Sequence, residues 1–306
     1  SSAASDVYKR QAATSYSVHH QPMIPFYIYY SMFGFQRVGD YIWQAGDMRA
    51  RGFLIGGTAG RTTLNGEGLQ HEDGNSHVHA HLVPNCHSYD PTYAYEVAVI
   101  IHHGMVEMYQ KHQDCFYYLT TMNENYAHRP FKKSYAKGII AGMYLLDSVA
   151  PKKQTQLQVQ LMGSGTILLE VEAASELLVK DFGVHCDVWS VTSANSLYRD
   201  AKDKARQSFR QPGKALAKSH LAQCLADHPG PVVGATDYVA LYLEQLRPFI
   251  DRTFVALGTD GFGRSDTREA LRAFFEVDRY HVAYAAMWSL HQEGLVDMTT
   301  LKKAHK

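Results

Sequence analysis

Short apolar runs recur along this chain, and they constrain its fold more than any other feature of the sequence. FLIGGT begins at Phe53 and contains a glycine pair, and similar runs follow at HLVPNC, CFYYLTT, LQVQLMGSG, CDVWSV, PVVGAT and TFVALG. Runs of this length are typical of strands that are buried on both faces. The stretches between most of them are long enough for crossover helices, so we expect α/β layers whose sheets are mostly parallel.

The chain is long enough for two such units. Its 306 residues are 45% hydrophobic, which is sufficient to bury a core in each unit. The stretch HRPFKKSYAK, residues 128–137, is polar, basic and interrupted by proline, as domain boundaries often are. We therefore predict two three-layer α/β/α domains that meet near residue 137. Helices are expected at residues 93–109, 138–146, 167–178 and 237–246, with Asp90 as the possible cap of the first.

Composition argues against several classes of function. Thirty basic residues balance thirty acidic ones, so no net charge favours nucleic acid or an anionic membrane. The most apolar stretch, residues 93–101, is far shorter than the roughly 20 residues of a membrane helix, and the amino terminus has no apolar signal core. Four widely spaced cysteines without a CxxC pair indicate neither disulfides nor a thiolate zinc site. A cytoplasmic protein fits these features best.

Residues 58–81, TAGRTTLNGEGLQHEDGNSHVHAH, form a polar, glycine-rich segment that is too long for a simple connection. It places Glu67, His71, Glu72 and Asp73 among glycines, and a carboxylate beside an imidazole can act as a general acid and base. A surface loop that is merely rich in histidine explains the composition equally well.

A metal site is a further interpretation of the same segment. His77, His79 and His81 alternate, so they would share one face if they lay on a strand. Together with His71 or Asp73 they could then bind zinc or iron.

Two other segments have a structural and a functional interpretation. The string PFYIYYSMFGFQR concentrates aromatic residues before a predicted helix through Trp43, and these rings either pack in the core or form a stacking wall for a flat heterocycle. The string GTDGFGRSDTREALRAFFEVD has a glycine pattern but no Walker lysine, so it is a weak nucleotide signal. We expect it to form a turn, then a helix that begins near Thr267 with Ser265 or Asp266 as cap, and to support the domain interface.

Five longer strings, taken together and in order, resemble one known family. They are PMIPFYIYYSMFGFQR, ARGFLIGGTAGRTTLNGEGLQHEDG, PNCHSYDPTYAYEVAVI, TTMNENY and GTDGFGRSDTREALRAFFEVD. They resemble the homodimeric, bacterial-type pyruvate dehydrogenase decarboxylating component from about residue 12 to the end of the chain. The resemblance implies a transketolase-like fold, with a pyrimidine-binding middle domain over residues 12–137 and a carboxyl-terminal domain over residues 138–306.

The resemblance also implies a reaction and its participants. Thiamine diphosphate would decarboxylate pyruvate, and the acetyl group would pass to the lipoyl domain of dihydrolipoyl acetyltransferase. His71 matches the family's active-site histidine, which we expect to donate the proton in that transfer, and Glu67 matches an acidic residue of the same pocket. Tyr30 and Phe33 match the aromatic residues around the aminopyrimidine. His77, His79 and His81 would then have structural or surface roles, because the family's only metal, Mg²⁺, is bound with the diphosphate elsewhere.

The sequence departs from the family pattern in two places. Residues 1–11, SSAASDVYKRQ, do not look like the family, which has a pyrimidine-activating glutamate there, so we expect them to be an artefact joined to a truncated frame. The diphosphate and magnesium domain is also expected to be absent, so the chain alone should have no measurable dehydrogenase activity. Another transketolase-superfamily enzyme, acting on a different keto acid or sugar, is the enzymatic alternative, and a non-catalytic, histidine-rich metal-binding module is the other.

Overall fold

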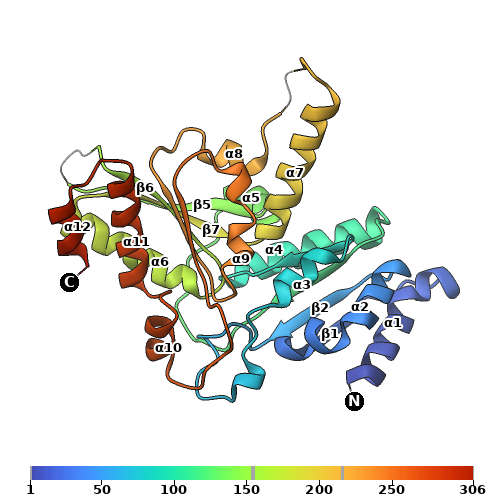
Figure 1. The fold of residues 1–306 in the computed structure, drawn as a ribbon. Coiled ribbons are helices and arrows are strands. Elements are labelled where there is room, and N and C mark those ends of the chain that lie inside the picture. Colours follow the sequence, from blue (N-terminus) through green and yellow to red (C-terminus); the bar gives the residue numbers. More distant parts are fainter. Residues whose placement is uncertain (1, 153–155, 215–216, 306) are drawn as a thin grey trace.

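The computed structural model describes residues 2–152, 156–214 and 217–305 and contains two sheets with helices packed against them (Figure 1). The first sheet has four strands in the order β1-β2-β4-β3, all parallel. Its elements are α1 (Ser2–Val18), β1 (Phe26–Tyr30), η1 (Ser31–Phe33), α2 (Phe35–Asp47), β2 (Phe53–Gly57), η2 (Leu69–His71), α3 (Ser76–Leu82), β3 (Cys86–Tyr89), α4 (Ala94–Met105), the π-helical turn η3 (Val106–Gln110) and β4 (Phe116–Thr120).

The second sheet has five strands in the order β5-β7-β6-β8-β9, and only β5 runs antiparallel to its neighbour. Its elements are η4 (Lys133–Tyr135), α5 (Ala136–Ala141), β5 (Met143–Val149), β6 (Gln158–Gly163), α6 (Ile167–Leu177), η5 (Leu178–Phe182), β7 (His185–Val191), α7 (Ala194–Arg210), α8 (His220–Leu225), β8 (Val232–Ala235), α9 (Leu241–Glu244), η6 (Arg247–Phe249), β9 (Phe254–Leu257), α10 (Arg268–Phe274), α11 (Arg279–Gln292) and α12 (Met298–Ala304). The prediction of α/β architecture with mostly parallel sheets is confirmed.

The apolar runs became buried strands because both of their faces are covered. In β4 every residue is buried, and Tyr117 pairs with Phe53 of β2 while Phe116 pairs with Cys86 of β3. One apolar core continues into the second sheet, where Leu161 and Val188 belong to the same cluster as Phe53. The two domains are therefore packed against each other through hydrophobic side chains as well as through the polar contacts described below.

Two predicted elements are wrong in extent. The expected strand at HLVPNC is instead the end of α3, which reaches Leu82, and β3 begins only at Cys86. The expected helix over residues 138–146 ends at Ala141, because Gly142 adopts a left-handed conformation with φ of 114°, and β5 starts at the next residue. Short apolar runs do not distinguish a strand from a buried helical turn, which explains both differences.

Helix starts also differ from the prediction. Asp90 does not cap α4; Glu96 closes that end by accepting hydrogen bonds from the N–H groups of Thr92 and Tyr93. The cap of α10 is Thr267 itself, whose Oγ1 accepts from the Ala270 N–H at 3.2 Å. The helix expected over residues 237–246 is shortened to the single turn α9.

No helix in the described part of the chain is both long and apolar enough to span a bilayer.

Candidate functional site

The four side chains that were predicted from the sequence meet at the carboxyl edge of the first sheet. Tyr30 is the last residue of β1, and Phe33 ends the turn η1 that follows it. Their ring centroids lie 6.0 Å apart, and the His71 ring lies 5.5 Å from Tyr30 and 5.2 Å from Phe33. Glu67 completes the group, since its Oε2 lies 3.6 Å from His71 Nδ1. The carboxyl ends of parallel strands are where α/β folds commonly bind ligands.

The His71 imidazole is supported but remains accessible. Its side chain is 24% exposed, and the 3.6 Å contact with Glu67 is too long for a hydrogen bond. Within the part of the chain that the structure describes, Nδ1 is buried without a hydrogen-bond partner. An imidazole placed this way, between two aromatic rings and a carboxylate, can exchange a proton with a ligand in front of it.

The aromatic segment divides between the two roles that the sequence left open. Tyr29 and Phe35 face the core, where both contact the ring of Tyr118. Tyr30 is 46% exposed and Phe33 is half-buried, so these two rings form an outward aromatic surface at the site. Spacing alone could not separate the two sets, because the alternation of β1 ends where the turn η1 begins.

The segment that carries Glu67 and His71 begins against a buried carboxylate that the sequence analysis did not identify as functional. Asp237 of the second domain accepts hydrogen bonds from the backbone N–H and the Oγ1 of both Thr62 and Thr63, at distances between 2.6 and 3.1 Å. Complete burial raises the pKa of Asp237 above its ordinary value. These bonds hold the start of the glycine-rich segment against the second domain, 174 or 175 residues away in the sequence.

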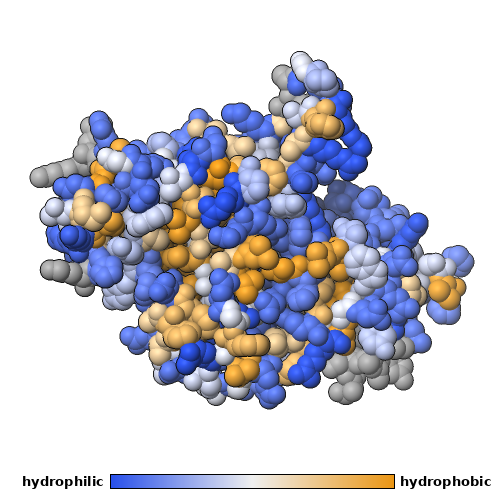
Figure 2. Space-filling model, viewed as in Figure 1, coloured by the Kyte–Doolittle hydropathy of each residue, from blue (hydrophilic) through white to orange (hydrophobic). Residues whose placement is uncertain are grey.

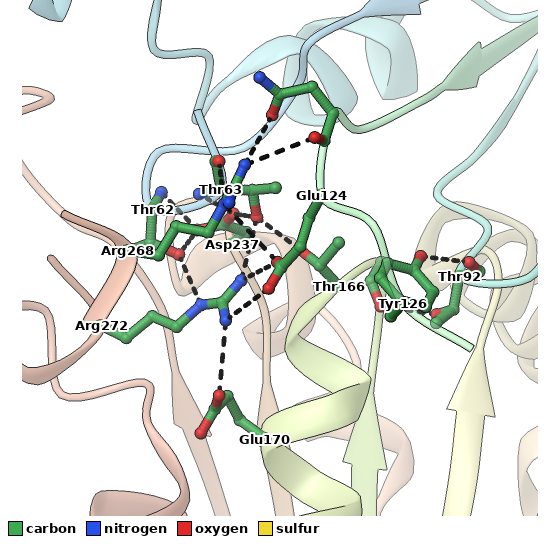
Figure 3. Close-up of polar contacts among 12 residues, drawn as sticks. Thr62, Thr63, Thr92, Glu124, Tyr126, Thr166, Glu170, Asp237, Arg268 and Arg272 are labelled. Carbon is green, nitrogen blue, oxygen red and sulfur yellow. Dashed lines mark hydrogen bonds and ion pairs between the residues drawn. The ribbon is translucent and has the colours of Figure 1, made fainter. Parts of the chain in front are cut away.

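Helix α10 adds two arginines to the same interface (Figure 3). Arg268 Nε donates to the Thr63 carbonyl at 2.7 Å. One turn later, Arg272 forms ion pairs with Glu124, in the segment after β4, and with Glu170 of α6. Residues four apart share one face of a helix, so both guanidinium groups point to the interface. The prediction that the segment leading into α10 supports the domain interface is confirmed.

The three alternating histidines do not share one face of a strand, because residues 76–82 are helical. His77 is fully buried, with Nε2 at 2.9 Å from Thr120 Oγ1, and burial lowers its pKa to about 4. His79 is exposed, and His81 packs edge-on against Tyr198. Across the described residues, no group of three His, Cys, Asp or Glu side chains is arranged to bind a metal ion. The metal interpretation therefore has no structural support there.

Comparison with known proteins assigns both halves of the chain. A family model described as pyruvate dehydrogenase E1 component middle domain matches residues 2–129, and one described as transketolase-like TK C-terminal domain matches residues 142–278. The pyruvate dehydrogenase E1 component of Pseudomonas aeruginosa is 56% identical over 294 residues, which is 96% of this chain. The chain belongs to the pyruvate dehydrogenase E1 family. The protein of the same name from Escherichia coli K12 is 52% identical over 295 residues, again 96% of this chain.

These comparisons also define what part of the family the chain represents. It spans 33% of the length of both relatives. The match of the middle-domain model begins at residue 2, within the segment of residues 1–11 that we expected to lie outside the family, and α1 runs through residue 11 without a break. The match of the second model begins at residue 142, four residues after the predicted start of the second domain at residue 138.

Solved structures support the fold independently of sequence identity. Transketolase from Leishmania mexicana superposes with a TM-score of 0.64 at 17% identity, covering 88% of this chain and 34% of that one. A split-gene transketolase, described as an inactive beta4 tetramer, superposes with a TM-score of 0.62 at 15% identity, covering 94% of this chain and 81% of that one. The transketolase-like fold predicted for the chain is confirmed.

Proposed function

We propose that this chain supplies the pyrimidine-facing side of a thiamine diphosphate site in a pyruvate dehydrogenase of the acetyl-transferring type. The reaction would be the oxidative decarboxylation of pyruvate, followed by reductive acetylation of the lipoyl group of the acyltransferase. The observation that carries the proposal is the convergence of Tyr30, Phe33, Glu67 and His71 on one edge of the first sheet. Membership of the pyruvate dehydrogenase E1 family supports the same reaction.

The exposed rings fit a flat cofactor. Tyr30 and Phe33 present aromatic surface outward, and such surface binds a planar heterocycle at little cost in conformational entropy. Thiamine diphosphate, when bound, supplies the electron sink that decarboxylation of a 2-keto acid requires. Mg²⁺ would accompany the diphosphate, in a part of the family's fold that the two matched domains do not include.

His71 would provide the proton for acetyl transfer. When the lipoyl disulfide opens, one sulfur receives the acetyl carbon and the other leaves as a thiolate that needs a proton. A half-buried imidazole at the site can donate this proton, and the Glu67 carboxylate, 3.6 Å from Nδ1, would favour the protonated ring. Both residues lie on a loop beside the aromatic surface, so the donor and the cofactor-binding rings would face the same substrate.

The proposed partners are pyruvate, the lipoyl domain and a second copy of the chain in a homodimer, in the cytoplasm. The subunit contact is supported by β1, an edge strand whose alternate residues Phe26, Ile28 and Tyr30 are exposed. Met23 and Ile24, just before it, are exposed as well. An edge strand with exposed apolar side chains is a surface that proteins usually cover.

Among enzymes, the alternative is another member of the transketolase superfamily. The solved transketolases share the fold, but the long HEDG and GRSD strings and the 56% identity favour the pyruvate enzyme. The histidine-rich metal module, the non-catalytic alternative, has no metal cluster among the described residues to support it.

The test is calorimetric titration of thiamine diphosphate and Mg²⁺ into this chain, and into a chimaera that joins the preceding residues of the Pseudomonas aeruginosa relative to it. We expect only the chimaera to bind tightly, to decarboxylate pyruvate and to acetylate a lipoyl domain. His71→Gln should reduce acetylation by the chimaera about 100-fold or more, whereas His79→Gln, at an exposed position of α3, should leave it unchanged. A chimaera that binds the cofactor but ignores pyruvate would contradict the proposed substrate.

A further inference from the structure

Three glycines near the candidate site each lie against a charged side chain that is buried. A methyl group added at Gly263 would overlap the Glu72 carboxyl, one at Gly74 would overlap the Arg61 guanidinium, and one at Gly60 would overlap Asp237. Two of these pairs join the glycine-rich segment after β2 to the second domain. Gly60 of GTAGRTT and Gly263 of GFGRSD each lie so close to a charged group that an added Cβ would displace it.

Of these three contacts, the one between Gly263 and Glu72 is nearest to His71 along the chain. Glu72 is 1% exposed, and its Oε2 accepts a hydrogen bond from the Arg264 backbone N–H at 2.5 Å. The other oxygen, Oε1, is buried and has no hydrogen-bond partner in the described part of the chain. A second bond runs beside it, from the Gly66 N–H to the Asp266 carbonyl at 3.1 Å. The loop after β9 therefore forms two hydrogen bonds with the segment that carries His71.

These two hydrogen bonds lie on either side of the turn that bears the His71 imidazole. The turn η2 consists of Leu69, Gln70 and His71, and Glu72 is the residue at which it ends. Leu69, at the start of the turn, lines a pocket of about 660 Å³ together with Phe262 and Phe274. Figure 2 shows hydrophobic residues gathered on the lower part of the visible face, where α10 lies in Figure 1. The turn thus begins at a pocket that it shares with the second domain and ends at a residue hydrogen-bonded to that domain.

We propose that Glu72 is a positioning residue, which ties the turn bearing His71 to the backbone of the Gly263–Arg264 loop so that the second domain sets the place of the imidazole. This proposal rests on the proposed role of His71. Glu72 does not touch the aromatic rings of the site in the contacts described, so its effect is exerted through His71.

The charged groups around Glu72 explain why its carboxyl depends on the hydrogen bond from Arg264. Burial raises the pKa of Glu72 to about 7, with a smaller contribution in the same direction from Asp237 of the second domain. The hydrogen bond from the Arg264 N–H, and to a lesser degree the Arg61 guanidinium, lower the pKa but do not cancel the effect of burial. Arg61 is itself shared with Asp73 and Asp260, while the Arg264 side chain lies over the Phe274 ring. Within the described residues Glu72 forms no ion pair, so the Arg264 N–H is its principal polar contact there.

The test uses nuclear magnetic resonance and hydrogen exchange on the 306-residue chain. The ring signal of His71 is identified by its loss in His71→Gln. We expect Glu72→Ala and Gly263→Ala to shift this signal and to speed exchange of the Arg264 amide by about tenfold or more. Glu72→Gln keeps an oxygen acceptor of the same shape, so it should preserve the slow exchange and most of the signal position.

Controls separate a local effect from unfolding. Gly39→Ala adds a methyl group where nothing lies within 4 Å, and Glu269→Gln changes an exposed carboxyl of α10. Both should leave the His71 signal and the Arg264 amide unchanged, and thermal unfolding should show that all variants are folded. An unchanged His71 signal in folded Glu72→Ala or Gly263→Ala would overturn the proposal. If the chimaera lacks acetyl transfer but Glu72→Ala still shifts its His71 signal, the positioning role stands and the proposed function is rejected.

Discussion

Arg272 of α10 and Glu124 of the first domain form an ion pair in which Nη2 lies 2.5 Å from Oε2. The arginine side chain is 7% exposed and the glutamate side chain 18%. A second carboxylate, Glu170, lies 3.4 Å from Nη1, so the guanidinium joins the segment after β4 to helix α6. The acids compensate the burial of the guanidinium and raise the pKa of Arg272 despite that burial.

Removing this arginine should destabilise the chain strongly. Arg272→Ala removes the close ion pair of Glu124 in a largely buried interface, whereas Glu170 keeps its ion pair with Arg279. We expect a loss of about 2 to 3 kcal/mol in the free energy of unfolding. Lys111→Ala, which removes an exposed pair with Glu107 on one helical segment, should cost no more than about 0.5 kcal/mol. Urea unfolding of both variants measures the difference, and equal losses would contradict the importance of the interface pair.

His71 should be required for acetyl transfer but not for folding. Because its side chain is partly exposed and makes no hydrogen bond through Nδ1, His71→Gln should change the unfolding free energy by less than about 1 kcal/mol. In the chimaera with the relative's preceding residues, the same change should reduce acetylation of the lipoyl domain by a factor of about 100 or more. Decarboxylation measured with an artificial electron acceptor should be reduced less. Equal losses in the two assays would argue against a proton donor specific to acetyl transfer.

The aromatic surface should contribute to cofactor affinity. Phe33→Ala removes one of the two outward rings, and we expect thiamine diphosphate to bind about tenfold more weakly to the chimaera. Phe209 lies far along α7 and is 88% exposed, so Phe209→Ala provides a matched control for loss of an exposed ring. Calorimetric titration compares the two variants. Unchanged affinity in Phe33→Ala would place the heterocycle elsewhere.

Glu72 should make stability depend on pH in a defined direction. Its pKa is about 7 in the folded chain, against an ordinary value of 4.5, so the folded state holds more protons than the unfolded state between these values. Stability contributed by the protonated carboxyl is therefore full below pH 4.5 and is lost as the pH rises to about 7. Relative to the wild type, Glu72→Gln should gain up to about 3 kcal/mol between pH 5 and pH 8.

Unfolding of the wild type and Glu72→Gln across that range tests the prediction. Other buried groups that titrate, such as Asp90, whose pKa burial raises to about 7, are present in both proteins and cancel in the comparison. Glu269→Gln, at an exposed site, should track the wild type at every pH. A difference between wild type and Glu72→Gln that stays constant with pH would show that Glu72 is ionised throughout.

Much of the fold and of the candidate site followed from the sequence. The apolar runs at FLIGGT and CFYYLTT became β2 and β4, because a strand covered on both faces needs no polar alternation. The resemblance selected Tyr30, Phe33, Glu67 and His71, and these four side chains do lie together. The choice of these residues came from the resemblance alone; they lie together because the segments after the parallel strands β1 and β2 leave the sheet at the same edge.

Only the tertiary structure revealed what supports those residues. Glu72 and Arg264 are 192 residues apart, and Thr62 lies 175 residues from Asp237. Such pairs leave no periodic signal in the sequence, because their proximity depends on how two complete sheets pack against each other. The glycines illustrate the same limit: their presence was visible at once, but the charged groups that exclude a side chain at Gly60, Gly74 and Gly263 come into contact with them only in the folded chain.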